Sequence, residues 1–146
     1  MKPVLLTPAH LDGVAELESL VFHAPWSARA LELLCQDNAF GVACVDGQGR
    51  VLAYGGMMTV LDEGQITNIA THPDHRRRGL GKAVVQALLE EAARRGLCSV
   101  VLEVRESNLA AISLYEAFGF TRIGRRKDFY SHPTEAALIL QKTLPA

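Results

Sequence analysis

The most informative stretch of this sequence is Arg76-Arg77-Arg78-Gly79-Leu80-Gly81-Lys82. Four of its seven residues are cations and two are glycines. The stretch lies between a strand-like segment and the clearest helical pattern in the sequence. Glycines allow backbone N–H groups to approach an anion closely, and a helix N-terminus adds a favourable dipole. The stretch therefore predicts a loop that holds a pyrophosphate or another polyphosphate.

Two common phosphate-binding motifs do not match this loop. The P-loop requires G-x-x-x-x-G-K-[ST], but Arg76 stands at its first glycine and Ala83 at its Ser/Thr position. The Rossmann fingerprint requires a third glycine where Val84 stands. The fingerprint also belongs to a parallel βαβ unit, whereas this loop follows a predicted antiparallel meander. The plainer alternative is a solvated basic helix start after a glycine turn. What remains is the pattern R-x-x-G-x-G, formed by Arg76, Gly79 and Gly81.

The residues after the loop predict an amphipathic helix over 79–95. Apolar residues recur every four positions from Leu80 to Ala92, while the positions between them are polar or charged. Gly96 then supplies the left-handed residue with which helices commonly end.

Further strands and helices are predicted on both sides of this unit. A strand at 3–6 precedes two helices that begin after the caps Thr7 and Ser27. Strand patterns separated by turn signals then cover 40–45, 51–60 and 65–71. Downstream we expect a strand at 99–104, a helix at 108–118, and strands at 120–124 and 136–140. This order predicts a fold that contains both helices and strands, of class α/β (α+β), with a mixed sheet and helices on its faces.

Length, charge and cysteine usage narrow the class of protein. The 146 residues fit a single domain over 1–146, and the net charge of -1 disfavours nucleic acid and anionic membranes as partners. The apolar run 4–6 is too short for a signal peptide, and no stretch approaches the ~20 apolar residues of a membrane span. Cys35, Cys44 and Cys98 form no CxxC pair and lie in apolar stretches. Buried thiols in a cytoplasmic protein are therefore expected.

Glu103 is the first candidate for catalysis. It ends an apolar run and, by strand alternation, shares a sheet face with Val101 and Arg105. One interpretation is a salt bridge to Arg105 at the end of the sheet. The other is a general base on a rigid strand, where partial desolvation raises the pKa of a carboxylate.

Tyr115 and Asn108 belong to the helix predicted next. Tyr115 lies on an apolar stripe with Ala111 and Phe118, so it is either a core aromatic or a general acid beside a leaving thiolate. A thiol pKa of ~8.5 and a phenol pKa of ~10 are close enough for useful proton transfer. Asn108 stands at the helix start, where an N-cap is the default role.

The loop, its strand and its helix resemble the coenzyme A site of the GCN5-related N-acetyltransferases (GNAT). In that family the loop amides hold the pyrophosphate, and the preceding strand splays from its neighbour and pairs with the pantetheine arm. The resemblance implies a mostly antiparallel, twisted sheet with a splayed central pair of strands, acetyl-CoA as cosubstrate and no metal. The binding residues that it implies are Ile69, Ala70, Thr71, Arg77, Arg78, Gly79, Leu80, Gly81 and Lys82.

A longer block resembles one subfamily, the ribosomal-protein-alanine N-acetyltransferases (RimI). The block comprises Leu102-Glu103-Val104-Arg105, Ser107-Asn108, Ala111-Ile112, Leu114-Tyr115-Glu116 and Gly119-Phe120. The resemblance implies Glu103 as base, Tyr115 as acid and Asn108 as a coenzyme A contact. Phe22-x-x-Pro25-Trp26-Ser27 also resembles the acceptor-side loop of that subfamily.

Two positions near the C-terminus depart from the subfamily pattern. Phe129-Tyr130 stands where two adjacent tyrosines are common, and Glu135-Ala136-Ala137 stands in place of Glu-Asp-Ala. Both segments are expected near the acceptor groove. They bear on the identity of the acceptor and not on acetyl transfer.

The expected reaction moves acetyl from acetyl-CoA to the α-amine of a protein N-terminus, with the N-terminal alanine of small-subunit ribosomal protein eighteen as leading acceptor. An α-amine of pKa ~7.7–8.0 is easier to deprotonate than a lysine at ~10.4. The expected partner is thus a peptide N-terminus, without direct nucleic acid or membrane contact. Alternatives are an acetyltransferase for small-molecule amines, a non-catalytic acyl-CoA sensor and a structural interaction domain. The pair Glu103 and Tyr115 argues against the sensor, because binding alone requires neither residue.

Two other kinds of chemistry are disfavoured. The five histidines show no convincing metal-ligand spacing with acidic residues or cysteines, so His72 and His75 are expected to support the turn before the loop. A nucleophilic cysteine needs an exposed, electropositive setting, and none of the three cysteines has one in the sequence.

Overall fold

The computed structural model describes residues 1–145 and contains a seven-stranded sheet in the order β1-β2-β3-β4-β5-β7-β6. Neighbouring strands run antiparallel except β4 and β5, which are parallel. The strands are β1 (Val4–Leu5), β2 (Ala39–Val45), β3 (Val51–Val60), β4 (Glu63–Thr71), β5 (Ser99–Arg105), β6 (Thr121–Tyr130) and β7 (Glu135–Thr143). The predicted mixed and mostly antiparallel sheet is confirmed.

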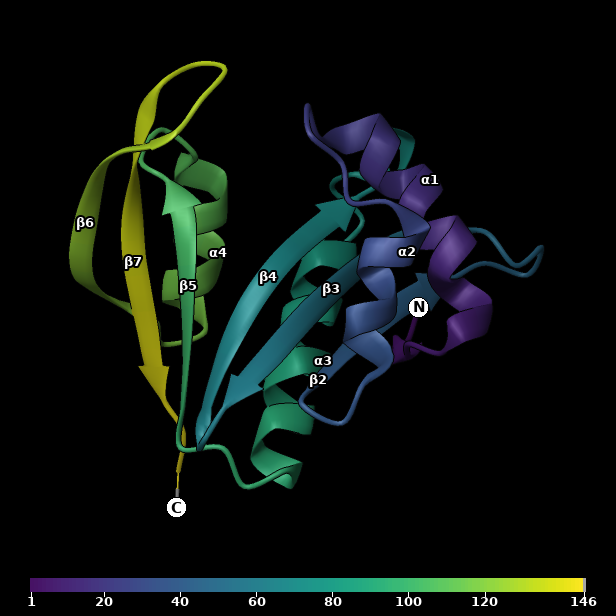
Figure 1. Cartoon of the computed structure of the whole chain (residues 1–146), viewed down its shortest axis with the longest axis horizontal. Coiled ribbons are helices and arrows are strands. Elements are labelled where there is room, and N and C mark those ends of the chain that lie inside the picture. Colours follow the sequence, from purple (N-terminus) through teal and green to yellow (C-terminus); the bar gives the residue numbers. More distant parts are fainter. Residues whose placement is uncertain (146) are drawn as a thin grey trace.

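Helices cover both faces of the sheet, as predicted. Figure 1 shows α1 and α2 on one face and α3 and α4 on the other. The helices are α1 (Leu11–Val21), α2 (Ala28–Leu31), α3 (Leu80–Arg94) and α4 (Leu109–Ala117), and 3-10 turns cover Pro8–His10, Glu32–Cys35 and Pro73–His75. Each face has its own apolar core, one against α3 and α4 and the other against α1 and α2.

Two adjacent glycines let these helices approach β3 closely. A Cβ atom on Gly55 would lie 2.7 Å from Cγ1 of Val84 on α3, and a Cβ on Gly56 would lie 2.8 Å from Cδ1 of Leu34. Both distances are shorter than Cβ contacts in real proteins, so a side chain at either glycine would have to displace these neighbours.

The parallel strands β4 and β5 diverge along their length. They pair from Glu63 to Gln65 on β4 and from Ser99 to Val101 on β5, and then separate, as Figure 1 shows. A bulge bends β4 just beyond this point, because Thr67 and Asn68 together oppose Gly56 of β3. The splayed central pair that the resemblance implied is therefore confirmed.

Several element boundaries differ from the predictions. β6 continues to Tyr130 rather than ending at residue 124, and β7 extends to Thr143 rather than to residue 140. The second half of β6 is exposed, so its sequence does not alternate between apolar and polar residues. It is a strand because it pairs with β7.

None of the helices described in residues 1–145 is long and apolar enough to cross a membrane.

The expected burial of all three cysteines is wrong for two of them. Cys44 is buried, but Cys35 and Cys98 are exposed. Cys35 was expected on one apolar face together with Leu31 and Leu34. The chain there adopts a 3-10 turn, whose period of about three residues keeps Leu31 and Leu34 buried and turns Cys35 toward solvent. Cys98 lies in the short turn between α3 and β5.

Candidate active site

The predicted phosphate loop is a tight left-handed turn at the start of α3. Arg77 and Gly79 have positive φ angles of 65° and 77°. The first helical hydrogen bond runs from the N–H of Ala83 to the carbonyl of Gly79, at 3.0 Å. The N–H groups of residues 80–82 thus precede any helical acceptor and point from the helix N-terminus. This arrangement suits an anion at the position that the glycine pattern predicted.

Gly81 faces the space between the end of β4 and α4. A Cβ atom there would lie 3.8 Å from Oγ1 of Thr71 and 3.8 Å from Cδ2 of Leu114, which is ordinary van der Waals contact. The packing of the protein therefore does not itself require glycine at this position. A ligand that approaches the backbone closely would explain why glycine stands at this position. Such a ligand would extend from here along β4.

The histidines beside the loop support the turn, as expected. The His72 ring accepts a hydrogen bond from the N–H of Asp74 at 3.1 Å, and it caps the 3-10 turn. Nδ1 of His75 lies 3.2 Å from a guanidinium nitrogen of Arg78. Within residues 1–145, no group of three or more His, Cys, Asp or Glu side chains is placed to hold a metal ion.

Glu103 lies on β5 beyond the last residue that pairs with β4. Its neighbours Leu102 and Val104 are buried against the α3 and α4 core, whereas the Glu103 side chain is exposed on the opposite face. The protein alone therefore does not provide the partial desolvation that we expected. The alternative of a salt bridge to Arg105 is also not seen, because Arg105 binds Glu135 at 3.2 Å instead.

Tyr115 approaches from α4 and is buried, with its ring edge-on to Phe120 at 5.6 Å between centroids. Burial, and to a lesser extent the nearby Tyr130, raises the pKa of Tyr115 to about 12. The phenol thus stays protonated at neutral pH, as a proton donor must. Its match to a thiol of pKa ~8.5 is poorer than the ordinary value of a phenol indicates.

Tyr130 is the residue that links the two candidates electrostatically. Its pKa is raised by burial first and then by the charge of Glu103. It also raises the pKa of Tyr115.

Asn108 acts as an N-cap, as predicted, because its side-chain oxygen accepts a hydrogen bond from the N–H of Ala111 at 3.2 Å. Its contact with coenzyme A stays a prediction.

Arg105 organises the turn between β6 and β7 on the same face as Glu103. Its guanidinium donates hydrogen bonds to the carbonyls of Ser131 at 2.8 Å and Pro133 at 3.0 Å. It also lies 4.5 Å from the centroid of the Tyr130 ring. Arg105 therefore holds the segment that contains the two departures from the subfamily pattern.

The turn between β6 and β7 meets the loop between α1 and α2. The rings of His23 and His132 lie 4.4 Å apart, so these two segments touch although they are distant in sequence. The loop at 22–27 is the one that resembles an acceptor-side loop. The predicted acceptor elements are thus brought together on the Glu103 face of the sheet.

A buried polar cluster beneath this loop was missed by the sequence reasoning. Glu18 of α1 is fully buried at 0% exposed and bonds to Tyr54 and Asn68. A signal was present, because Glu18 falls at helical spacing between the buried Val14 and the apolar Val21. A charged residue inside an apolar stripe is unusual enough to mark a buried polar site.

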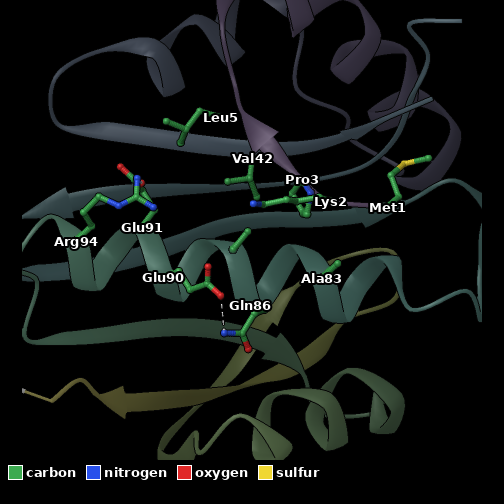
Figure 2. Close-up of a pocket in the computed structure, with 11 residues that line it drawn as sticks. Met1, Lys2, Pro3, Leu5, Val42, Ala83, Gln86, Glu90, Glu91 and Arg94 are labelled. Carbon is green, nitrogen blue, oxygen red and sulfur yellow. Dashed lines mark hydrogen bonds and ion pairs between the residues drawn. The ribbon is translucent and has the colours of Figure 1, made fainter. Parts of the chain in front are cut away.

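A separate hollow of about 390 Å³ lies between the N-terminal segment and α3. Figure 2 shows Lys2 and Pro3 on one side of it and Gln86 and Arg94 on the other. None of the predicted binding or catalytic residues lines it. It is therefore not part of the candidate active site.

Comparisons with known proteins agree with this geometry. A family model described as the acetyltransferase (GNAT) family matches residues 11–120. The ribosomal protein bS18-alanine N-acetyltransferase of Escherichia coli strain K12 is 44% identical over 125 residues, which are 86% of this chain and 84% of that protein. The protein of the same name from Salmonella typhimurium is 34% identical over 126 residues, again 86% and 84% of the two chains.

Solved structures give the same result. The crystal structure of the ribosomal-protein-S18-alanine N-acetyltransferase from Escherichia coli matches with a TM-score of 0.89 at 30% identity, covering 99% of this chain and 95% of that one. An aminoglycoside 6'-N-acetyltransferase complexed with coenzyme A matches in fold, with a TM-score of 0.83 at 17% identity, covering 100% and 99%. Because a family model covers most of the sequence and relatives above 30% identity span most of their length, the chain belongs to the acetyltransferase (GNAT) family.

Proposed function

We propose that this protein transfers the acetyl group of acetyl-CoA to the α-amine of a protein N-terminus, with the N-terminal alanine of ribosomal protein bS18 as its acceptor. The observation that supports the proposed reaction is that β4 and β5 diverge. They do so in the region between the glycine turn of α3 and the side chains of Glu103 and Tyr115. The observation that supports the acceptor is 44% identity to an enzyme named for that alanine.

The donor would bind along β4 with its diphosphate at the N-terminus of α3. The free N–H groups of residues 80–82 would hold the phosphate oxygens, aided by the exposed cations Arg77, Arg78 and Lys82. The edge of β4 at residues 69–71 is not paired with β5, so its backbone groups are available to the pantetheine arm. In this proposal the thioester lies where the two strands have separated.

The acceptor amine would lose its proton on the Glu103 side of the site. Glu103, through a water molecule, takes the proton from the ammonium, and the amine nitrogen then attacks the thioester carbonyl. A backbone N–H of residues 69–71 meets the developing oxyanion. Because Glu103 is exposed without ligands, the bound substrates themselves would provide its desolvation.

Collapse of the intermediate breaks the carbon–sulfur bond and leaves the new amide. The amine nitrogen gives up its second proton to solvent water, and the departing thiolate takes a proton from the phenol of Tyr115, which regains one from solvent. Since the pKa of Tyr115 is raised to about 12, its main contribution is a hydrogen bond that strengthens as charge develops on sulfur. Free coenzyme A and the acetylated N-terminus are the products.

A peptide panel tests this proposal. Hexapeptides that begin Ala-Arg, Met-Leu and Ser-Glu, and an N-blocked peptide with an internal lysine, are incubated with acetyl-CoA and read by mass spectrometry. We expect α-acetylation, fastest on the Ala-Arg peptide, which begins with the alanine of the proposed acceptor. Acetylation of the internal lysine alone would contradict the proposal. Weak activity on every peptide with strong activity on a polyamine would support a small-molecule acceptor instead.

A further inference from the structure

Glu18 is buried without any cation among its hydrogen-bond partners. It belongs to α1, and its side chain is 0% exposed. A buried carboxylate is costly unless its oxygens accept hydrogen bonds, so a side chain kept in this position needs a compensating role. The exposed Glu16, two residues earlier on the same helix, shows that α1 carries carboxylates on its solvent face.

Three donors from three different elements converge on this carboxylate. Oε1 accepts from the backbone N–H of Trp26 at 2.9 Å. Oε2 accepts from the hydroxyl of Tyr54 on β3 at 2.5 Å and from the side-chain amide of Asn68 on β4 at 3.1 Å. Burial, followed by the bond to Glu18, raises the pKa of Tyr54, which therefore stays a donor.

The positions of the donors connect the two halves of the site. Asn68 is one of the two bulge residues of β4, and it directly precedes the segment 69–71 proposed to bind the donor. Trp26 lies in the loop 22–27 proposed to contact the acceptor. Its N–H is held by a side chain of α1 and not by the sheet. One carboxylate thus ties the acceptor loop to the bend of the donor strand.

We propose that Glu18 is a positioning residue that fixes the acceptor loop relative to the thioester, a role that rests on the proposed function. It touches neither substrate. Its loss should loosen residues 22–27 and weaken productive acceptor binding, while the phosphate turn at α3, which has no contact with it, keeps its affinity for coenzyme A. If Glu18 only supported the fold, its loss would lower acceptor binding and coenzyme A affinity together.

The chain offers a direct reporter of this loop, because Trp26 is its single tryptophan. Glu18→Met keeps much of the side-chain volume and removes both acceptor oxygens, whereas Glu18→Gln retains one oxygen. Glu16→Gln is the matched control on the same helix. Tyr54→Phe keeps the buried ring and removes one donor, so it tests the cluster if the Glu18 variants do not fold.

Three measurements are made on each variant: acrylamide quenching of Trp26 fluorescence, calorimetric binding of coenzyme A, and kcat and KM for the Ala-Arg peptide. Hydrogen bonds to a charged group are worth enough that Glu18→Met should lower peptide kcat/KM by about 10- to 100-fold. We expect increased quenching, a coenzyme A affinity within about threefold of wild type, an intermediate effect for Glu18→Gln and none for Glu16→Gln.

The outcomes separate this proposal from the proposed function. Unchanged quenching and unchanged peptide kinetics in Glu18→Met, or in Tyr54→Phe where the former does not fold, would overturn the role of Glu18. An equal loss of coenzyme A affinity and peptide kcat/KM would overturn it too, because that result indicates a general structural role. If wild type acetylates no peptide but Trp26 is loosened in the variants, the anchoring of the loop stands and the proposed acceptor is wrong.

Discussion

The two halves of the proposed site, called here the donor half and the acceptor half, are built in different ways. The donor half is one continuous segment, residues 69–82, in which the end of β4, a glycine turn and the start of α3 follow one another. The acceptor half draws on α1, the loop 22–27, β5 and the turn between β6 and β7. A polyphosphate can be held by local backbone groups, whereas an amine acceptor needs side chains that only the folded chain brings together.

The two halves also differ in charge. The donor turn carries the exposed cations Arg76, Arg77, Arg78 and Lys82. The acceptor half carries the exposed carboxylate of Glu103, and Arg105 beside it is neutralised by Glu135. In the proposed function, the cationic turn would attract the diphosphate of the donor, and the anionic face would attract the ammonium group of the acceptor. The comparison predicts that variants in one half leave the binding step of the other half intact.

The largest expected effect is on the acceptor half. Glu103→Gln keeps the shape of the side chain and removes its basicity, so turnover should fall ~10²–10⁴-fold. Coenzyme A affinity should remain that of wild type, since Glu103 lies away from the phosphate turn. Steady-state rates with the Ala-Arg peptide, together with calorimetry, measure both quantities. Glu116→Gln, an exposed carboxylate on α4, is the control. Near-wild-type turnover between pH 6 and about 9 would remove Glu103 from the mechanism.

The next effect is on the donor half. Gly81→Val places a branched side chain between Thr71 and Leu114, where the protein itself has room for a Cβ atom but the diphosphate approaches. The variant should fold and should weaken coenzyme A binding on the order of 10- to 100-fold, through lost hydrogen bonds to a charged group. Calorimetry reads the affinity, and circular dichroism checks the fold. A folded variant that binds coenzyme A as wild type does would show that the turn is misassigned.

A smaller effect is expected at the far wall of the acceptor half. Arg105→Ala removes the donors to Ser131 and Pro133 and the ion pair with Glu135. The turn between β6 and β7 should loosen, and the KM of the peptide should rise about three- to tenfold, as expected for one or two hydrogen bonds. The kcat should change less, and coenzyme A affinity should not change. Arg122→Ala on exposed β6 is the control, and an equal rise in its peptide KM would contradict the role of Arg105.

The last effect concerns stability at high pH. The pKa values of the buried Tyr54 and Tyr115 are raised, the latter to about 12, so the folded state binds their protons more tightly than the unfolded chain. Stability is unaffected below about pH 10, the unfolded pKa, and falls as the pH rises above it, by up to about 1.4 kcal/mol per pH unit for each tyrosine. Urea unfolding between pH 8 and about 11 measures the slope.

Single tyrosine variants assign that slope. Tyr115→Phe and Tyr54→Phe should each make the free energy of unfolding less dependent on pH in this range. Tyr115→Phe should also lower turnover while the fold is kept. A wild-type protein whose stability is constant up to pH about 11 would contradict the burial of these phenols.

The order of elements was predictable because it rests on local signals. The spacing of apolar residues predicts helix α3. Gly96 follows its end with the expected left-handed conformation, at φ 78°. The N-cap roles of Ser27 and Asn108 were likewise predicted, and each side chain accepts from the N–H three residues later. The second half of β6 was not predictable, because an exposed edge strand with basic side chains has no periodicity to detect.

The site divides in the same manner. R-x-x-G-x-G marks the donor turn in the sequence, since closely spaced backbone groups need closely spaced residues. Glu18 was missed because carboxylates on amphipathic helices usually face water. The salt bridge between Glu103 and Arg105, one of the two interpretations of the sequence, is not formed because the cross-strand neighbour Glu135 and the carbonyls of the following turn bind the guanidinium. Such competition depends on β7 pairing with β5.

The element order, the glycine turn before α3 and the residues that resemble a base and an acid can be predicted from the sequence, because each depends on neighbours within a few positions along the chain. The point where β4 leaves β5, the partner of Arg105, and the bonds of Glu18 to Trp26 and Asn68 follow from the tertiary structure alone. These features are hydrogen bonds and packing contacts between residues that are distant in sequence. Their energies depend on burial and geometry that arise only when the sheet and its two layers of helices have assembled.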